Sequence, residues 1–157
     1  MDQTTPIDQL GTMLCFNIHA LHRSFGRYYQ AAFSETGLTY PKFVILMALD
    51  SAGPMSVSDL SGHAGVEANT LSPLLKKMAT FGAITRARAE ADERRVEVAI
   101  TPMGQEILTR ARAVIAEGFA ELQIDPDRMA DVLSFLSEVR GKVQKADPPK
   151  LSFDGLT

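Results

Sequence analysis

The sequence predicts a mainly α-helical fold with one small β-hairpin, and three observations support this fold class. Apolar residues recur every three or four positions over most of the 157-residue chain, as they do on one face of a helix. The pattern changes to alternation only near residues 83–101. Hydrophobic residues make up 45% and charged residues 22%, which suits a single globular domain with a core.

A glycine and a proline separate the first two predicted helices. Residues 7–35 contain no proline and predict one long helix, which Gly37 breaks. Pro41 suits the first turn of the next helix, and the stretch KFVILMALD (42–50) is apolar enough to be largely buried. A turn at Gly53 follows this helix.

Two shorter helices come next. Ser56, with Asp59 three positions later, has the pattern of a capped helix start, and Gly65 ends this helix. The stretch VEANTLSPLLKKMATFG (66–82) predicts a second helix, because its leucines and methionine fall at helical spacing before the final glycine.

Two alternating runs predict the β-hairpin. The first run is AITRARA (83–89), and the second is RRVEVAIT (94–101), which places Val96, Val98 and Ile100 on one face. The polar stretch EADE between them is typical of a turn.

Two helices close the predicted fold over residues 102–145. Each carries a narrow apolar seam, which suits the packing of one helix against another and suggests a dimer. We expect residues 146–157 to form a flexible tail.

Over about residues 41–101, the predicted elements are a helix, a short helix, a turn, a further helix and a two-stranded ribbon. This is the order of elements in a winged helix-turn-helix. The second helix of this motif fits the major groove of DNA, and its hairpin reaches an adjacent minor groove. On the second helix, we predict that Asn69, Thr70 and Ser72 contact base edges and that Lys76 and Lys77 contact the DNA backbone. In the hairpin wing, we predict that Arg86, Arg94 and Arg95 contact DNA and that Asp92 orients Arg94.

Topology, rather than charge, carries this DNA-binding prediction. The formal net charge of −3 argues mildly against a nucleic-acid partner. Residues 54–101 contain six Lys or Arg and six Asp or Glu residues, so the predicted DNA-binding segment has no net charge.

Several other classes of site have no signal in the sequence. A single cysteine forms no internal disulfide, and three histidines without CxxC or HExxH specify no metal site. No glycine-rich phosphate loop is present, so we expect no cofactor. No apolar run approaches the roughly 20 residues that span a bilayer, and the N-terminus lacks the features of a secretory signal. We therefore expect a cytoplasmic protein without a membrane partner.

The stretch NTLSPLLKKMATFGAITRARAEADERRVEVAITPMGQEI (69–107) resembles the core of MarR-family transcriptional regulators. Its portion DERRVEVAITPMG resembles the wing signature of that family, and the resemblance extends over about residues 8–145. It implies a homodimer built from the terminal helices, about 7–35 and 102–145, that binds a near-palindromic operator. It also implies that a signal weakens DNA binding.

Within that family, LCF near the start of the chain and GLTYP before the second helix resemble the one-cysteine organic hydroperoxide sensors, the OhrR subgroup. In these sensors an organic hydroperoxide oxidises one N-terminal cysteine, which two tyrosines hydrogen-bond in the reduced state. The resemblance assigns these roles to Cys15, Tyr29 and Tyr40.

One residue and one short stretch depart from the sensor pattern. His19 stands where these sensors often carry another tyrosine, and it has two interpretations: a group that promotes the reactivity of the thiol, or part of a pocket for another ligand. The recognition helix begins with VEANT rather than an Asp-Ser-Gly-type sequence, so the operator is expected to differ.

Helix geometry predicts where the thiol meets the tyrosines. Cys15 and Tyr29 are 14 positions apart on the predicted helix, which places them on nearly the same face but about 21 Å apart. They cannot touch within one straight helix. We therefore expect Cys15 of one protomer to face Tyr29 and Tyr40 of its partner, so that oxidation shifts the dimer helices and re-spaces the recognition helices.

The sequence thus predicts a DNA-binding repressor that is not an enzyme and is released when Cys15 is oxidised. One alternative is a regulator released by a small aromatic or phenolic ligand bound between the dimer helices and the winged domain, with Cys15 incidental. A one-cysteine thiol peroxidase and an architectural DNA binder without a signal are further alternatives.

Overall fold

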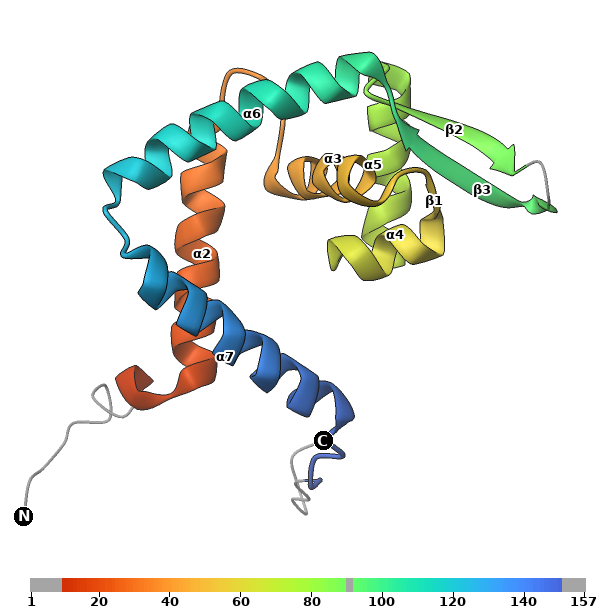
Figure 1. Cartoon of the computed structure of the whole chain (residues 1–157). Helices are drawn as coiled ribbons and strands as arrows, with labels where there is room; N and C mark the ends of the chain where they lie inside the picture. The colour runs from red at the N-terminus through yellow and green to blue at the C-terminus, as the bar shows by residue number, and fades with distance from the viewer. Residues whose placement is uncertain (1–9, 90–91, 151–157) are drawn as a thin grey trace, which may run out of the picture. The chain divides into compact units, whose positions relative to one another are not determined.

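The computed structural model describes residues 10–89 and 92–150 and confirms the predicted winged helix-turn-helix (Figure 1). The chain divides into two compact units, Met1–Ala116 and Glu117–Thr157. The elements are α2 (Leu14–Ala32), α3 (Tyr40–Ala52), β1 (Met55–Ser56), α4 (Val57–Ala64), α5 (Ala68–Phe81), β2 (Ile84–Ala89), β3 (Asp92–Ile100), α6 (Pro102–Glu121) and α7 (Pro126–Lys145).

Residues 7–9 of the helix predicted over 7–35 lie outside the described residues, and within the described part the helix α2 starts only at Leu14 and ends at Ala32. Met13 is extended, with φ −80° and ψ 120°, and separates helical residues 10–12 from α2. The amide of Asn17 donates to the carbonyl oxygens of Gly11 (2.8 Å) and Met13 (2.9 Å), so it satisfies backbone groups that the break exposes. After α2, a turn leads to Gly37, whose φ of +66° ends the helical path.

The predicted ends of the two middle helices are confirmed. The Ser56 hydroxyl accepts a hydrogen bond from the Asp59 N–H (3.1 Å) and donates one to the Asp59 carboxylate (2.6 Å), which caps α4. Gly65 ends α4 with φ +61°, and Gly82 ends α5 with φ +87°. Both angles lie in the left-handed region that favours glycine.

The sheet has three antiparallel strands in the order β1-β3-β2, one more strand than the sequence predicts. The extra strand, β1, pairs Met55 with Val98 and Ser56 with Glu97. Two residues are too few to show alternation, so the sequence gives no signal for this strand. The predicted hairpin of β2 and β3 is confirmed, with Ile84 opposite Ile100.

One hydrophobic core joins α3, α4, α5, the sheet and α6. Its large, fully buried side chains are Ile45, Leu46, Leu49, Leu60, Leu71, Leu75, Ile84, Val98 and Leu108. Burial of each such side chain contributes roughly 1.5–3 kcal/mol to folding. The core therefore fixes α5 against the rest of the winged helix-turn-helix.

The end of α5 and the start of α6 are tied together. The Thr101 hydroxyl donates to the Gly82 carbonyl oxygen (2.6 Å) and accepts from the Gly104 N–H (3.1 Å). The Thr101 N–H donates to the Ala83 carbonyl oxygen (3.2 Å). These bonds connect the recognition helix directly to α6.

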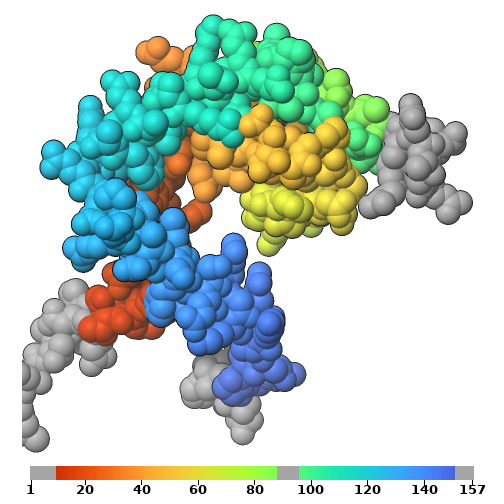
Figure 2. Space-filling model, in the orientation of Figure 1, coloured from red at the N-terminus to blue at the C-terminus, as the bar shows by residue number. Residues whose placement is uncertain are grey.

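A second link joins α6 to α3, whose surfaces lie against each other in Figure 2. The guanidinium of Arg112 pairs with the Asp50 carboxylate at 2.8 Å, and its Nε donates to Met47 Sδ at 3.2 Å. The position of α3 is thus coupled to that of α6.

The helices α2 and α7 contain no buried residue. Large apolar side chains are exposed on both, namely Leu14, Phe16, Ile18 and Leu21 on α2 and Val132, Leu133, Phe135 and Val143 on α7. Among the described residues, no helix combines the length and apolarity that crossing a membrane requires.

Candidate DNA interface and thiol site

The recognition helix α5 divides cleanly into a buried and an exposed face. Leu71, Leu75 and Met78 recur at helical spacing and are buried. All five predicted DNA contacts on this helix, Asn69, Thr70, Ser72, Lys76 and Lys77, have exposed side chains. The core therefore holds the helix while its polar residues remain free to meet another molecule.

Lys77 has a second environment that the sequence did not indicate. Its side chain lines a cavity of about 460 Å³, together with residues of α3 and α6. Lys76 does not line this cavity, although it is the neighbouring residue on the same helix.

The wing is described in part. Arg86 lies in β2 opposite Val98, and its side chain is exposed. Asp92, Arg94 and Arg95 belong to β3 by their backbone, but their side chains lie outside what the structure describes. Their predicted contacts with DNA remain predictions.

The thiol site begins at the first turn of α2. Cys15 is a free, exposed cysteine, and His19 lies one helical turn later with an exposed side chain. Within α2, Cys15 is 14 positions from Tyr29, about 21 Å at 1.5 Å per residue. One protomer therefore does not bring the thiol to the tyrosine on its own helix.

The structure does bring the two predicted tyrosines together. The rings of Tyr29 from α2 and Tyr40 from α3 have centroids 4.7 Å apart. Phe33 and Phe43 complete an aromatic cluster, with centroids 5.7 Å and 5.9 Å from Tyr29. The sequence analysis missed these two phenylalanines, although each follows a predicted tyrosine by three or four positions, the spacing of one helix face.

The aromatic cluster changes the chemistry of Tyr29. Burial raises the pKa of its hydroxyl above the ordinary value of 10.0, and the neighbouring Tyr40 and Tyr28 hydroxyls raise it further. Tyr29 therefore keeps its proton to a higher pH than an exposed tyrosine does. It is available as a hydrogen-bond donor to an anion such as a thiolate.

Comparisons with known proteins agree with the winged helix-turn-helix fold. Residues 38–96 match the model of the MarR family. The HTH-type transcriptional regulator TtmR of Methylorubrum extorquens (strain PA1) is 35% identical over 107 residues, which cover 67% of this chain but only 55% of TtmR. This chain therefore spans little more than half of that relative.

The HTH-type transcriptional regulator SarZ of Staphylococcus aureus (strain USA300) is 27% identical over 127 residues, which cover 81% of this chain and 86% of SarZ. Both relatives are transcriptional regulators rather than enzymes.

Two solved structures share the fold. Overoxidized AbfR bound to DNA has a TM-score of 0.71 at 24% identity, with 86% of this chain and 95% of that chain covered. BpsR of Bordetella bronchiseptica, whose DNA binding is regulated by 6-hydroxynicotinic acid, has a TM-score of 0.73 at 19% identity, with 87% and 96% covered. The chain is therefore similar to transcriptional regulators of the MarR family, and residues 38–96 are the segment that matches the family model.

Proposed function

We propose that the protein is a homodimeric repressor that leaves a near-palindromic operator when an organic hydroperoxide oxidises Cys15. The observation that carries this proposal is the contact between Tyr29 and Tyr40, whose ring centroids are 4.7 Å apart. Two phenols from different helices meet at one place, while the thiol that the resemblance pairs with them lies about 21 Å along α2.

A second copy of the chain supplies the missing partner. The helix α2 buries none of its residues and exposes Leu14, Phe16, Ile18 and Leu21 around the thiol. Exposed apolar surface of this kind marks an interaction site. In a two-fold symmetric dimer, the same surface patch serves both protomers, so each Cys15 meets the partner's tyrosines in one arrangement.

The chemistry follows from a thiol beside two phenols. The sulfur of the Cys15 thiolate attacks one oxygen of the hydroperoxide, the O–O bond breaks, and the alkoxide leaves and takes up a proton as the alcohol. Sulfur is oxidised by two electrons to a sulfenic acid, and the peroxide is reduced. The hydroxyl of Tyr29 favours the reaction by donating to the thiolate.

Oxidation then changes the fit of the site. A sulfenic acid is larger and more polar than a thiolate, so the phenols must move to accommodate the added oxygen. Tyr40 is the first residue of α3, which Arg112 links to α6. Movement of Tyr40 would therefore alter the spacing of the two recognition helices, which must match one turn of DNA, about 34 Å.

The relatives support this proposal without deciding between signals. AbfR, which has been solved in an overoxidized form on DNA, favours oxidation, and BpsR, which responds to 6-hydroxynicotinic acid, favours a small aromatic ligand. For this chain, the exposed Cys15 and the paired tyrosines favour oxidation. We place the regulator in the cytoplasm, where its DNA lies and where free thiols persist.

The Cys15→Ser variant tests the proposal. Operator affinity is measured by fluorescence anisotropy before and after cumene hydroperoxide, and the mass of the intact protein is recorded in parallel. We expect the reduced wild type and the variant to bind equally, and only the wild type to gain oxygen and lose affinity. Peroxide-induced release that persists in Cys15→Ser would refute oxidation of Cys15 as the signal.

A further inference from the structure

All three tyrosines of the chain belong to one aromatic cluster, and the chain has no tryptophan. Tyr28 and Tyr29 are consecutive residues of α2, and Tyr40 is the first residue of α3. Phenols give up a hydrogen atom to an oxygen radical readily, because the phenoxyl radical is delocalised over the ring. A radical that attacks phenols therefore has a single target region in this chain.

The rings of Tyr29 and Tyr40 lie closer together than those of Tyr28 and Tyr29. The centroids of Tyr29 and Tyr40 are 4.7 Å apart, at the short end of the roughly 4.5–7 Å found for aromatic pairs. The centroids of Tyr28 and Tyr29 are 6.0 Å apart, and their rings are nearly perpendicular. Consecutive residues of a helix do not face each other. The geometry therefore favours contact between the ring carbons of Tyr29 and Tyr40.

The two tyrosines of this pair differ in their surroundings. Phe33 and Phe43 are buried, and both rings contact Tyr29. Tyr29 packs against the hydrophobic core, whereas Tyr40 is 42% exposed. One ring of the pair is thus positioned by the core, and the other is open to an oxidant from solution.

We propose that Tyr29 and Tyr40 form a site of oxidative cross-linking, at which organic peroxyl radicals join the two rings as dityrosine. Each peroxyl radical takes one hydrogen atom from a phenolic O–H and leaves as the hydroperoxide, so two peroxyl radicals convert both tyrosines into phenoxyl radicals. These combine through ring carbons next to the oxygens and form one C–C bond. Each bonded carbon then loses a proton, and the oxygen of the same ring gains one. The protein has lost two hydrogen atoms, and both phenols are restored.

The cross-link would join α2 to α3 by a covalent bond. Its regulatory consequence rests on the proposed function, in which movement of Tyr40 transmits the oxidation of Cys15 to α6. Two rings that share a bond cannot move apart. We therefore expect a cross-linked protein to stay on its operator when Cys15 is oxidised.

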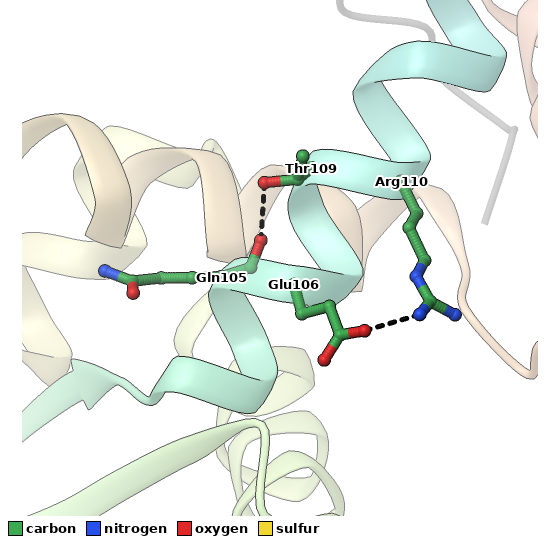
Figure 3. Close-up of polar contacts among 4 residues, drawn as sticks. All are labelled: Gln105, Glu106, Thr109 and Arg110. Carbon is green, nitrogen blue, oxygen red and sulfur yellow. Dashed lines mark hydrogen bonds and ion pairs between the residues drawn. The ribbon is translucent and has the colours of Figure 1, made fainter.

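The helix α6 would receive the movement of α3 through Arg112. Immediately before this residue, Arg110 forms an ion pair with Glu106 four positions earlier, which favours the helical conformation. The Thr109 hydroxyl donates to the Gln105 carbonyl oxygen in the same part of the helix (Figure 3). This part of α6 is a continuous helix, so we expect it to follow α3 as one segment.

The Cys15→Ser variant tests the cross-link first, because it has no thiol that competes for the radicals. The full-length protein is treated with azobis(amidinopropane), which releases alkylperoxyl radicals in air, and the blue emission of dityrosine is recorded. The absence of tryptophan leaves this emission free of overlap. We expect a product with the mass of one chain less two hydrogen atoms, and a digest in which the peptides of Tyr29 and Tyr40 are joined.

Matched variants identify the reacting pair. Adding Tyr28→Phe to the Cys15→Ser protein should leave the emission, whereas adding Tyr29→Phe or Tyr40→Phe should remove most of it. Each of these changes keeps the aromatic ring, and circular dichroism checks that the helices are retained. The absence of dityrosine, equal emission after Tyr40→Phe, or a cross-link found only between two chains would overturn the proposal.

The regulatory consequence is measured on the wild type. Cys15 is blocked as a methyl disulfide during cross-linking and is then freed with dithiothreitol, and operator affinity is measured before and after cumene hydroperoxide. The cross-linked protein should keep its affinity, whereas protein taken through the same steps without the radical source should lose it. Release of the cross-linked protein would refute this consequence. A control that is not released would count against the proposed function alone, because formation of the cross-link is measured without the thiol and without DNA.

Discussion

The junction between the recognition helix and α6 leaves no room for a side chain at Gly104. A Cβ atom added there would lie 2.1 Å from the Ala83 carbonyl oxygen and 2.8 Å from Ile100 Cγ1. Real Cβ atoms do not approach a backbone oxygen so closely, so the Gly104→Ala variant must move the start of α6 away from the start of β2.

The size of the effect follows from what this movement breaks. Overpacking of a well-packed site costs roughly 1–3 kcal/mol. The Thr101 bonds to Gly82 and Ala83 would be strained or lost, at about 1 kcal/mol each. Alanine recovers about 1 kcal/mol through its better helix propensity. We therefore expect Gly104→Ala to lower the free energy of unfolding by about 2–4 kcal/mol.

Chemical denaturation followed by circular dichroism measures this change, at one protein concentration because the stability of the proposed dimer would depend on it. The matched control is Gly141→Ala in α7, where an added Cβ meets nothing within 4 Å. This variant should gain stability, by up to about 1 kcal/mol. A Gly104→Ala protein that is as stable as the wild type would refute the packing argument at this junction.

Three other predictions follow from the fold and the site. Ser56→Ala removes the cap of α4 and should cost about 1 kcal/mol in the free energy of unfolding, whereas Ser24→Ala on the exposed face of α2 should cost much less. Arg94→Ala should weaken operator binding about tenfold or more in a gel-shift assay with an unchanged melting temperature, because a wing tip carries little core; equal affinity would contradict its predicted role. Since the pKa of Tyr29 is raised, the unfolded chain loses this proton first as the pH rises, so the contribution of Tyr29 to stability is complete below about pH 10 and is lost above it. The stability of Tyr29→Phe should therefore fall less steeply than that of the wild type above pH 10, and parallel curves would contradict the pKa shift.

Local signals explain why most element boundaries could be predicted from the sequence. Ser56, Gly65 and Gly82 act on the backbone within one turn of their own position, so their effect does not depend on the rest of the fold. The break at Met13 was missed because it depends on the side chain of Asn17, whose amide is equally compatible with a continuous helix. The strand β1 was missed because its only partner is a strand more than 40 positions later.

The sequence predicted which residues belong to the candidate site, but not how they are arranged in space. Tyr29 and Tyr40 were identified by resemblance, but the four-ring cluster depends on how α2 and α3 meet, which the sequence does not specify. Lys77 was predicted as a DNA contact from its place on the recognition helix. Its place beside Lys42 and Arg110 arises from three separate helices, so no pattern within one helix reveals it.

Ser56 belongs to two elements at once, because it pairs with Glu97 in the sheet and caps α4. Ser56 therefore connects the hairpin directly to α4, so a rotation of one of these elements is transmitted to the other. In the proposed complex with DNA, α4 and the hairpin of each protomer would therefore approach the duplex as one unit. In that complex, adaptation to operators with differently spaced half-sites would fall to the segments outside residues 40–101.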